Sequence, residues 1–211
     1  MKRHSSSTAL WLAVFSTLLL ASSRAQYSTP TPGAQRPPAQ QVHSEAFESA
    51  RQKFQWIERN GESANPSTVP TVLTAREWNA YLNEGGVKLP EGVSGVRITS
   101  EPGIAQGEAE IDFDRLTANR TKGNPLLYLF TGKHRVNVNA HARAGNGIGT
   151  VQVDSVFLDG VEIPRLALEY FSSRYLRPKY GNAVGLDSRF ALHNRIDTAI
   201  AGNNQVAITQ R

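Results

Sequence analysis

The sequence predicts an α+β fold in which a curved antiparallel sheet of hairpins packs on amphipathic helices. Three segments, 44–59, 74–82 and 164–177, carry apolar residues at helical spacing. Between and after them, pairs of segments alternate apolar with polar residues and are joined by tight turn sequences, as is typical of hairpins. Strands joined by short turns pair antiparallel, and helices can then cover one face of the sheet.

The first helix is predicted over 44–59, with Ser44 as its N-cap and Asn60-Gly61 at its end. Trp56 falls on the side opposite the apolar stripe. The stripe consists of Ala46, Phe47, Ala50, Phe54 and Ile57. A one-sided helix of this kind is expected to dock on the rest of the core.

The second helix has the most specific start signal in the chain. Thr74 is followed three residues later by Glu77, which predicts a capping box. Leu73 precedes the cap and Trp78 is the fourth helical residue, a spacing that favours a hydrophobic staple.

Three pairs of strands are predicted. The first covers 93–113 and turns at Pro102-Gly103, and its acidic residues 108, 110 and 112 alternate with apolar ones, which indicates one solvated face. A short helical turn is expected over 124–130. The second pair turns at 144–147, and the last lies within 189–211.

Residues 1–25 resemble an export signal. Lys2 and Arg3 precede an apolar run over 9–21, and Ser23 and Ala25 are small residues at the −3 and −1 positions of a cleavage site after Ala25. The alternative is a retained membrane anchor. Cleavage predicts a periplasmic or secreted protein with no integral membrane span.

The mature chain is then expected to hold a Pro/Gln-rich disordered tether over 26–43 and a single α+β domain over 44–211, with its main body at 70–211. It keeps 20 basic and 18 acidic residues, so no basic stripe for nucleic acid survives. Cysteine is absent, which excludes disulfides and thiolate chemistry.

No catalytic motif is found, and the prediction is a protein that is not an enzyme and has no cofactor. The histidines His43, His134, His141 and His193 lack metal-ligand spacing, so no metal site is expected. His134 and His141 are an odd number of positions apart on one predicted strand and should point to opposite faces. The glycine-rich 145–149 lies between strands and is expected to be a hairpin turn rather than a phosphate loop.

The segment 164–177 has an apolar arc of roughly 200°, wider than one buried stripe. One interpretation is a core helix whose Arg174 reaches outward past its neighbours. The other is a helix that faces both the sheet and an apolar ligand, with Arg174 placed to meet an anionic head group. The candidate ligand-binding residues are Leu166, Tyr170, Phe171, Arg174 and Tyr175.

Four segments together resemble bacterial extracytoplasmic lipid-binding proteins of the LmeA type, which are related in architecture to TULIP domains. The segments are 73–82, 104–109, 160–164 and 190–209, within a similarity that covers about 70–211. The chain has Leu192-His193 where that family often has Leu-Pro. The resemblance implies a long curved sheet wrapped around a helix, an apolar groove for acyl chains and no catalytic residues.

The leading hypothesis is therefore an exported protein that binds a lipid or other amphiphile in an apolar groove between the sheet and the helix 164–177. The alternative is a cell-envelope interaction or scaffold module with no small ligand, whose partner is an envelope protein.

Overall fold

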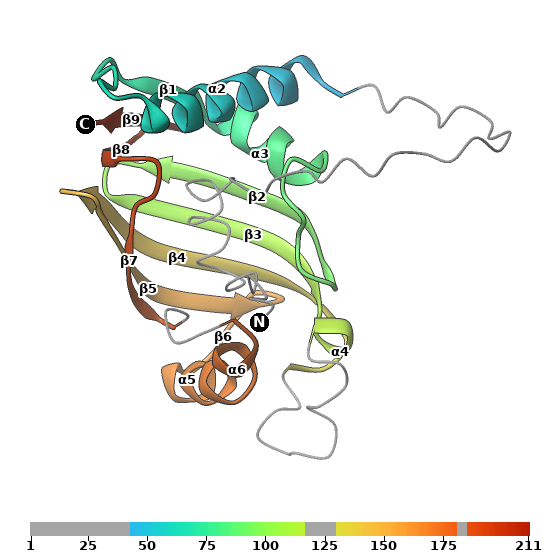
Figure 1. The fold of residues 1–211 in the computed structure, drawn as a ribbon. Helices are drawn as coiled ribbons and strands as arrows, with labels where there is room; N and C mark the ends of the chain where they lie inside the picture. Colours follow the sequence, from blue (N-terminus) through green and yellow to red (C-terminus); the bar gives the residue numbers. More distant parts are fainter. Residues whose placement is uncertain (1–42, 117–129, 181–184) are drawn as a thin grey trace, which may run out of the picture.

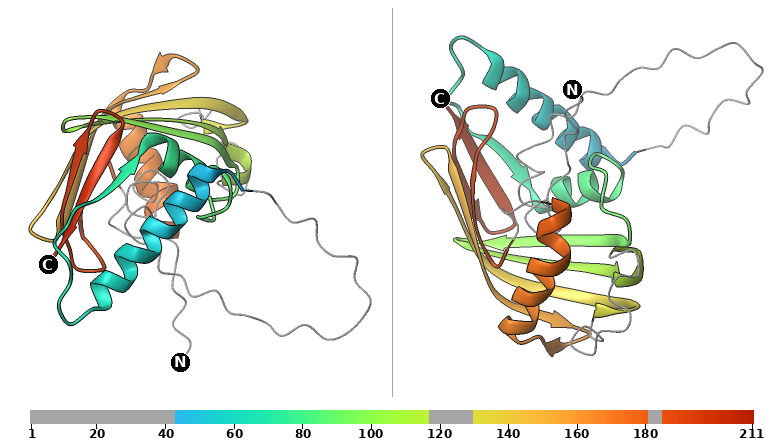
Figure 2. Two further views of the ribbon diagram at one scale, coloured as in Figure 1. Left: turned by 90° about the horizontal axis from the view of Figure 1, so that it is seen from above. Right: turned by 60° about the horizontal axis from the view of Figure 1, so that its bottom comes forward.

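The computed structural model describes residues 43–116, 130–180 and 185–211. The predicted signal segment, almost all of the predicted tether and most of the predicted turn 124–130 lie outside these residues. Within the described residues, nine strands form one open antiparallel sheet, and the predicted fold class is confirmed. The sheet is strongly curved, and the helices lie on its concave side (Figures 1 and 2).

The strands follow the order β1-β9-β8-β4-β3-β2, and β5 pairs with β4, β6 and β7. Ala144 of β4 pairs with Ala199 of β8, which joins the three strands β1, β9 and β8 to the larger part of the sheet. The bounds are β1 (Thr71–Thr74), β2 (Val93–Glu101), β3 (Ile104–Asp112), β4 (Lys133–Gly145), β5 (Ile148–Leu158), β6 (Val161–Glu162), β7 (Asp187–Ala191), β8 (Ile196–Gly202) and β9 (Gln205–Gln210).

Helix α2 (Glu45–Glu62) begins where predicted, with the Ser44 hydroxyl accepting a hydrogen bond from the Phe47 N–H at 3.1 Å. The predicted end at Asn60-Gly61 is wrong, because both residues lie inside the helix. The buried Asn60 amide donates to Gln210 of β9, and a Cβ on Gly61 would overlap the backbone of Asn194. Tertiary contacts therefore explain this Asn-Gly pair.

Helix α3 (Ala75–Asn83) begins with the predicted capping box, in which Thr74 and Glu77 exchange hydrogen bonds. The Glu77 carboxylate also accepts from the Ser49 hydroxyl and, at 2.6 Å, from the Lys53 ammonium, both on α2. Burial by itself would raise the pKa of Glu77, but the hydrogen bonds from Lys53, Ser49 and Thr74 outweigh it and lower the pKa to about 2. One carboxylate thus starts α3 and ties it to α2.

Two asparagines of α3, one turn apart, cover the edge of β2. Asn79 accepts from the Ile98 N–H at 2.7 Å and donates to the Ile98 carbonyl at 2.8 Å. Asn83 does the same at Val96, at 3.0 and 2.6 Å. The side-chain amides satisfy backbone groups that an edge strand otherwise leaves open to pairing with another chain.

The three predicted strand pairs are confirmed as β2–β3, β4–β5 and β8–β9. The turn between β4 and β5 has positive φ at Asn146 and Gly147, as a two-residue hairpin turn requires. The acidic residues of β3 face outward, and Glu108 lies 3.4 Å from Arg135 of β4. A register shift places Asp154 of β5 as an extra residue opposite β4.

The last helix is longer and less regular than predicted. It runs as α5 (Arg165–Phe171), a π-helical segment η2 (Ser172–Leu176) and α6 (Arg177–Tyr180). The expected end before Pro178 is wrong, because Pro178 lies inside α6. The wider turn comes directly before this proline and is closed by a hydrogen bond from the Arg177 N–H to the Ser172 carbonyl. We refer to these three parts together as the 165–180 helix.

Candidate functional site

The five predicted ligand-binding residues lie on the 165–180 helix but do not share one face. Phe171 is buried, and its ring centroid lies 4.2 Å from that of Phe130 and 5.7 Å from that of Phe113. The half-buried Tyr175 lies beside it, with a ring separation of 5.5 Å. These aromatic rings fill the space beneath the middle of the helix and anchor it to the rest of the protein.

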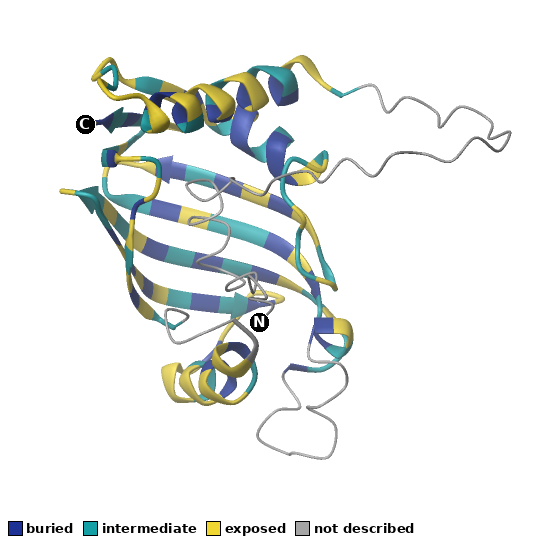
Figure 3. Cartoon of the chain, viewed as in Figure 1, coloured by how far each residue is buried: buried dark blue, intermediate teal, exposed yellow. Residues whose placement is uncertain are grey.

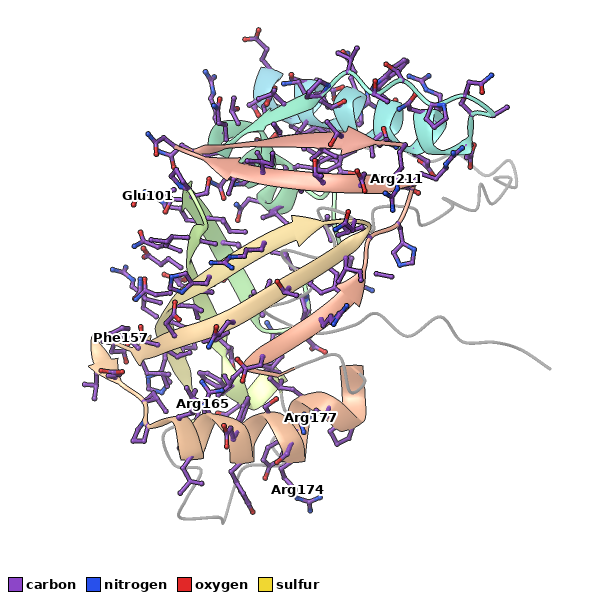
Figure 4. All side chains as sticks on the ribbon, turned by 90° about the vertical axis from the view of Figure 1, so that its left-hand side faces the viewer. Glu101, Phe157, Arg165, Arg174, Arg177 and Arg211 are labelled. Atoms are coloured by element: carbon purple, nitrogen blue, oxygen red, sulfur yellow. The ribbon has the colours of Figure 1, made fainter. Side chains whose placement is uncertain are left out.

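Leu166, Tyr170 and Arg174 are all exposed. The side chain of Leu166 is 79% exposed and that of Tyr170 is 40% exposed, although both are large and apolar. Figure 3 shows that α5 is mostly exposed, whereas α2 has a buried stripe. Arg174 points away from the sheet (Figure 4). The wide apolar arc is thus divided into a side that is anchored by Phe171 and Tyr175 and a side that is exposed at Leu166 and Tyr170.

Leu166 and Tyr170 line a pocket of about 430 Å³ on the outer side of α5. Its far wall is formed by Leu186 and Asp187, at the beginning of β7, and Arg177 also lines it. Pockets of roughly 300–1,000 Å³ that combine apolar walls with a few polar groups are typical of small-molecule sites. We call it the helix pocket.

The charges around the helix pocket are mostly paired. Arg165 lies 3.0 Å from Glu169 and 2.6 Å from Asp187, so this guanidinium links the helix to β7. Within the described chain, no acidic side chain lies at ion-pair distance from Arg174. Arg174 is therefore a cation available to a ligand.

Sequence reasoning missed the contribution of β7 to this pocket. Leu186 and Asp187 follow the helix in the chain, but no hairpin signal predicts β7, because its partner β5 begins about forty residues earlier. Arg165 was also not among the candidates. Its ion pair with Asp187 depends on the same long-range pairing.

The two histidines of β4, His134 and His141, each have a carboxylate partner. His134 lies on the inner face of β4 and His141 on the outer face, as predicted from their spacing. Nδ1 of His134 lies 2.7 Å from Asp159, and Nε2 lies 2.7 Å from the Thr131 carbonyl, so both nitrogens are engaged. The hydrogen bond between His134 and Asp159, together with one from the Arg135 N–H, lowers the pKa of the Asp159 carboxyl group. Among the described residues, no three metal-ligating side chains come together.

A larger surface pocket of about 850 Å³ lies at the end of β3 and β4. Its lining carries charges of both signs in equal number: three acidic residues, Glu110, Asp112 and Asp159, and three basic residues, Arg115, Lys133 and Arg135. His134, which also lines this pocket, is held by Asp159. The balance of charge and the polar lining give it no clear preference for an apolar or an ionic ligand.

In the ranges that the structure describes, no helix combines the length and the apolar composition needed to cross a bilayer. We compared the chain with protein-family models, curated proteins and solved structures, and none of them matches.

Proposed function

We propose that this protein binds an amphiphile with one acyl chain and an anionic head, and that the helix pocket is the site. The exposure of Leu166 and Tyr170 on the wall of a pocket carries the proposal. The acyl chain lies against these two side chains and Leu186, which line the pocket. The head group extends beyond the pocket to Arg174, which follows Tyr170 by one turn and points away from the sheet (Figure 4). The LmeA-type resemblance and the predicted export agree with such a ligand, and both are themselves predictions.

Exposed apolar side chains are common on protein surfaces, so the argument depends on their setting. Ile200 of β8 is 65% exposed, and β8 lies at the opposite end of the molecule from α5 (Figure 1). Leu166 and Tyr170 differ from Ile200 because they lie together, one helical turn apart, on the wall of a pocket. Arg174, for which the described residues provide no ion pair, follows Tyr170 by one more turn of the same helix. The anchored rings of Phe171 and Tyr175 hold this part of the helix in place from the other side.

The test is calorimetric titration of the purified protein with oleate below its critical micelle concentration. Covering one large apolar side chain contributes about 1.5–3 kcal/mol, so Leu166→Ser and Tyr170→Ser should each weaken binding by about tenfold or more. Arg174→Gln should weaken it by about two- to fivefold, since the ion pair is exposed to solvent. None of the three variants should lower the melting temperature appreciably.

Ile200→Ser is the matched control, because it removes a large apolar side chain whose exposure lies between those of Tyr170 and Leu166 and which is far from the pocket (Figure 1). An equal loss of affinity in Ile200→Ser, or wild-type affinity in both Leu166→Ser and Tyr170→Ser, would contradict the proposed site. A protein that binds no oleate and yields no acyl compound on organic extraction would contradict the proposed function. That result would favour the envelope-interaction module predicted as the alternative.

A further inference from the structure

A third pocket, of about 580 Å³, lies on the outer face of β4, β5 and β7, the face opposite the helices (Figure 2). Its lining is polar, and six of its residues form two rows across the three strands. In one row Arg143 pairs with Thr150, and Thr150 pairs with Arg189. In the next row His141, Gln152 and Asp187 take the corresponding positions. We call it the outer-face pocket.

The register brings the two arginines to the same face of the sheet. Residues opposite each other in neighbouring strands point to the same face, and all three residues of the first row are exposed on the outer face. Arg143 and Arg189 are two strands apart, so their Cα atoms are roughly 10 Å from each other. Two long side chains can meet over Thr150 across that distance.

The acidic residues of the outer-face pocket already have partners. Asp154 lies 2.7 Å from Nδ1 of His141, and Asp187 lies 2.6 Å from Arg165 of the 165–180 helix. No acidic group in the described ranges pairs with Arg143 or Arg189. The first row therefore carries two uncompensated guanidinium groups, which repel each other until an anion lies between them.

The donors suit a phosphate group. Guanidinium groups bind phosphate oxygens through paired hydrogen bonds, and two of them can hold one phosphate from opposite sides. The Thr150 hydroxyl between them makes only a long hydrogen bond of 3.4 Å to the Arg143 carbonyl, so it can turn toward a ligand. We propose that Arg143, Thr150 and Arg189 bind a phosphate group, either of a free phosphate compound or of a lipid head.

This site is separate from the helix pocket, although Asp187 lines both. The proposal does not rest on the binding of an acyl chain. Oleate has no phosphate group, so a failure of the oleate test leaves the phosphate site standing, and a failure here leaves the amphiphile site standing.

The first measurement is titration of the purified protein with inorganic phosphate at constant ionic strength, with binding detected by two-dimensional NMR or by calorimetry. Arg143→Gln and Arg189→Gln should each weaken binding by about tenfold, the loss expected when one charge-assisted contact is removed. Arg97→Gln is the control, because Arg97 is an exposed arginine on the outer side of β2, outside the pocket. Arg97→Gln should leave phosphate binding unchanged, and all three variants should have the melting temperature of the wild type.

The second measurement distinguishes the two sources of phosphate. It compares binding to phosphatidylcholine vesicles with and without phosphatidic acid. If the wild type binds the vesicles that contain phosphatidic acid, and Arg143→Gln and Arg189→Gln do not, the site is assigned to a lipid head. If the wild type binds inorganic phosphate but not these vesicles, the site is assigned to a free phosphate compound. If the wild type binds neither probe, or if Arg97→Gln loses as much as the pocket variants, the proposal is overturned.

Discussion

Helix α3 and the 165–180 helix lie on the same side of one sheet but are attached in different ways. In α3, the polar side chains bond to the protein: Glu77 binds Thr74, Ser49 and Lys53, and Asn79 and Asn83 cover the edge of β2. Its large apolar residues, Trp78, Tyr81 and Leu82, are buried. The 165–180 helix begins at Pro164 without a side-chain cap and leaves Leu166 79% and Tyr170 40% exposed.

The difference indicates a division of roles. Around α3, the polar side chains of Glu77, Asn79 and Asn83 all bond to other parts of the protein, so this region should determine stability. On the 165–180 helix, Phe171 provides the anchor while the outer residues contribute little to folding, because they are exposed in the folded protein. Mutations in the two regions should therefore separate stability from binding.

The largest effect is expected at Trp78. Its side chain is almost fully buried, and its indole N–H donates to the Ile98 carbonyl at 3.1 Å. Trp78→Ala should lower the free energy of unfolding by about 3–5 kcal/mol, as measured by urea denaturation. A loss below about 1 kcal/mol would show that α3 is not the stabilising region.

Glu77 should make stability depend on pH. Its pKa is about 2 in the folded protein against 4.5 as the ordinary value, so its contribution is present above pH 4.5 and is lost as the pH falls toward 2. The contribution corresponds to about 3 kcal/mol. Urea denaturation from neutral pH down to about pH 2 should show a steeper loss in the wild type than in Glu77→Gln. Parallel curves for the two proteins would rule out this role.

A smaller effect is expected from replacing both Asn79 and Asn83 with leucine. A hydrogen bond contributes about 0.5–1.5 kcal/mol net, and water can replace part of each lost bond at this edge. We therefore expect the free energy of unfolding to fall by about 2 kcal/mol. The uncovered β2 edge should also promote association, which light scattering detects. Asn139→Leu on β4, inside the sheet, should leave the protein in its wild-type association state. Association of both variants would argue against the edge role.

The smallest effect is expected at Leu166. Because its side chain is 79% exposed, Leu166→Ala should change the free energy of unfolding by no more than about 0.5 kcal/mol. A loss comparable to that of Trp78→Ala in the same urea experiment would mean that Leu166 is a structural residue, and the division of roles would fail.

The sequence predicted those features that depend on near neighbours in the chain. The Thr74–Glu77 capping box spans four residues, and the turn at Asn146-Gly147 needs two, so both are visible as local patterns. The short strand β1 was missed because it pairs with β9, more than 130 residues later. Gly61 led to the wrong prediction of a helix end for a related reason. A glycine is needed there because the backbone of Asn194 leaves no room for a side chain, not because the helix ends.

The candidate site was predicted in part. The width of the apolar arc indicated a helix with two apolar sides, and the residues themselves lie on that helix. Periodicity gives the angle between Phe171 and Leu166 but not which of them faces the sheet, because that depends on tertiary contacts with Phe113 and Phe130. The row of Arg143, Thr150 and Arg189 requires the register of three strands, which no local pattern encodes.

The most direct test of the proposed amphiphile site is hydrogen–deuterium exchange with and without oleate. We expect oleate to slow exchange in peptides that cover 165–176 and 186–187, and to leave the exchange of α3 unchanged. Slower exchange confined to α3 and β2, or no change anywhere at saturating oleate, would contradict the assignment of binding to the outer side of the 165–180 helix.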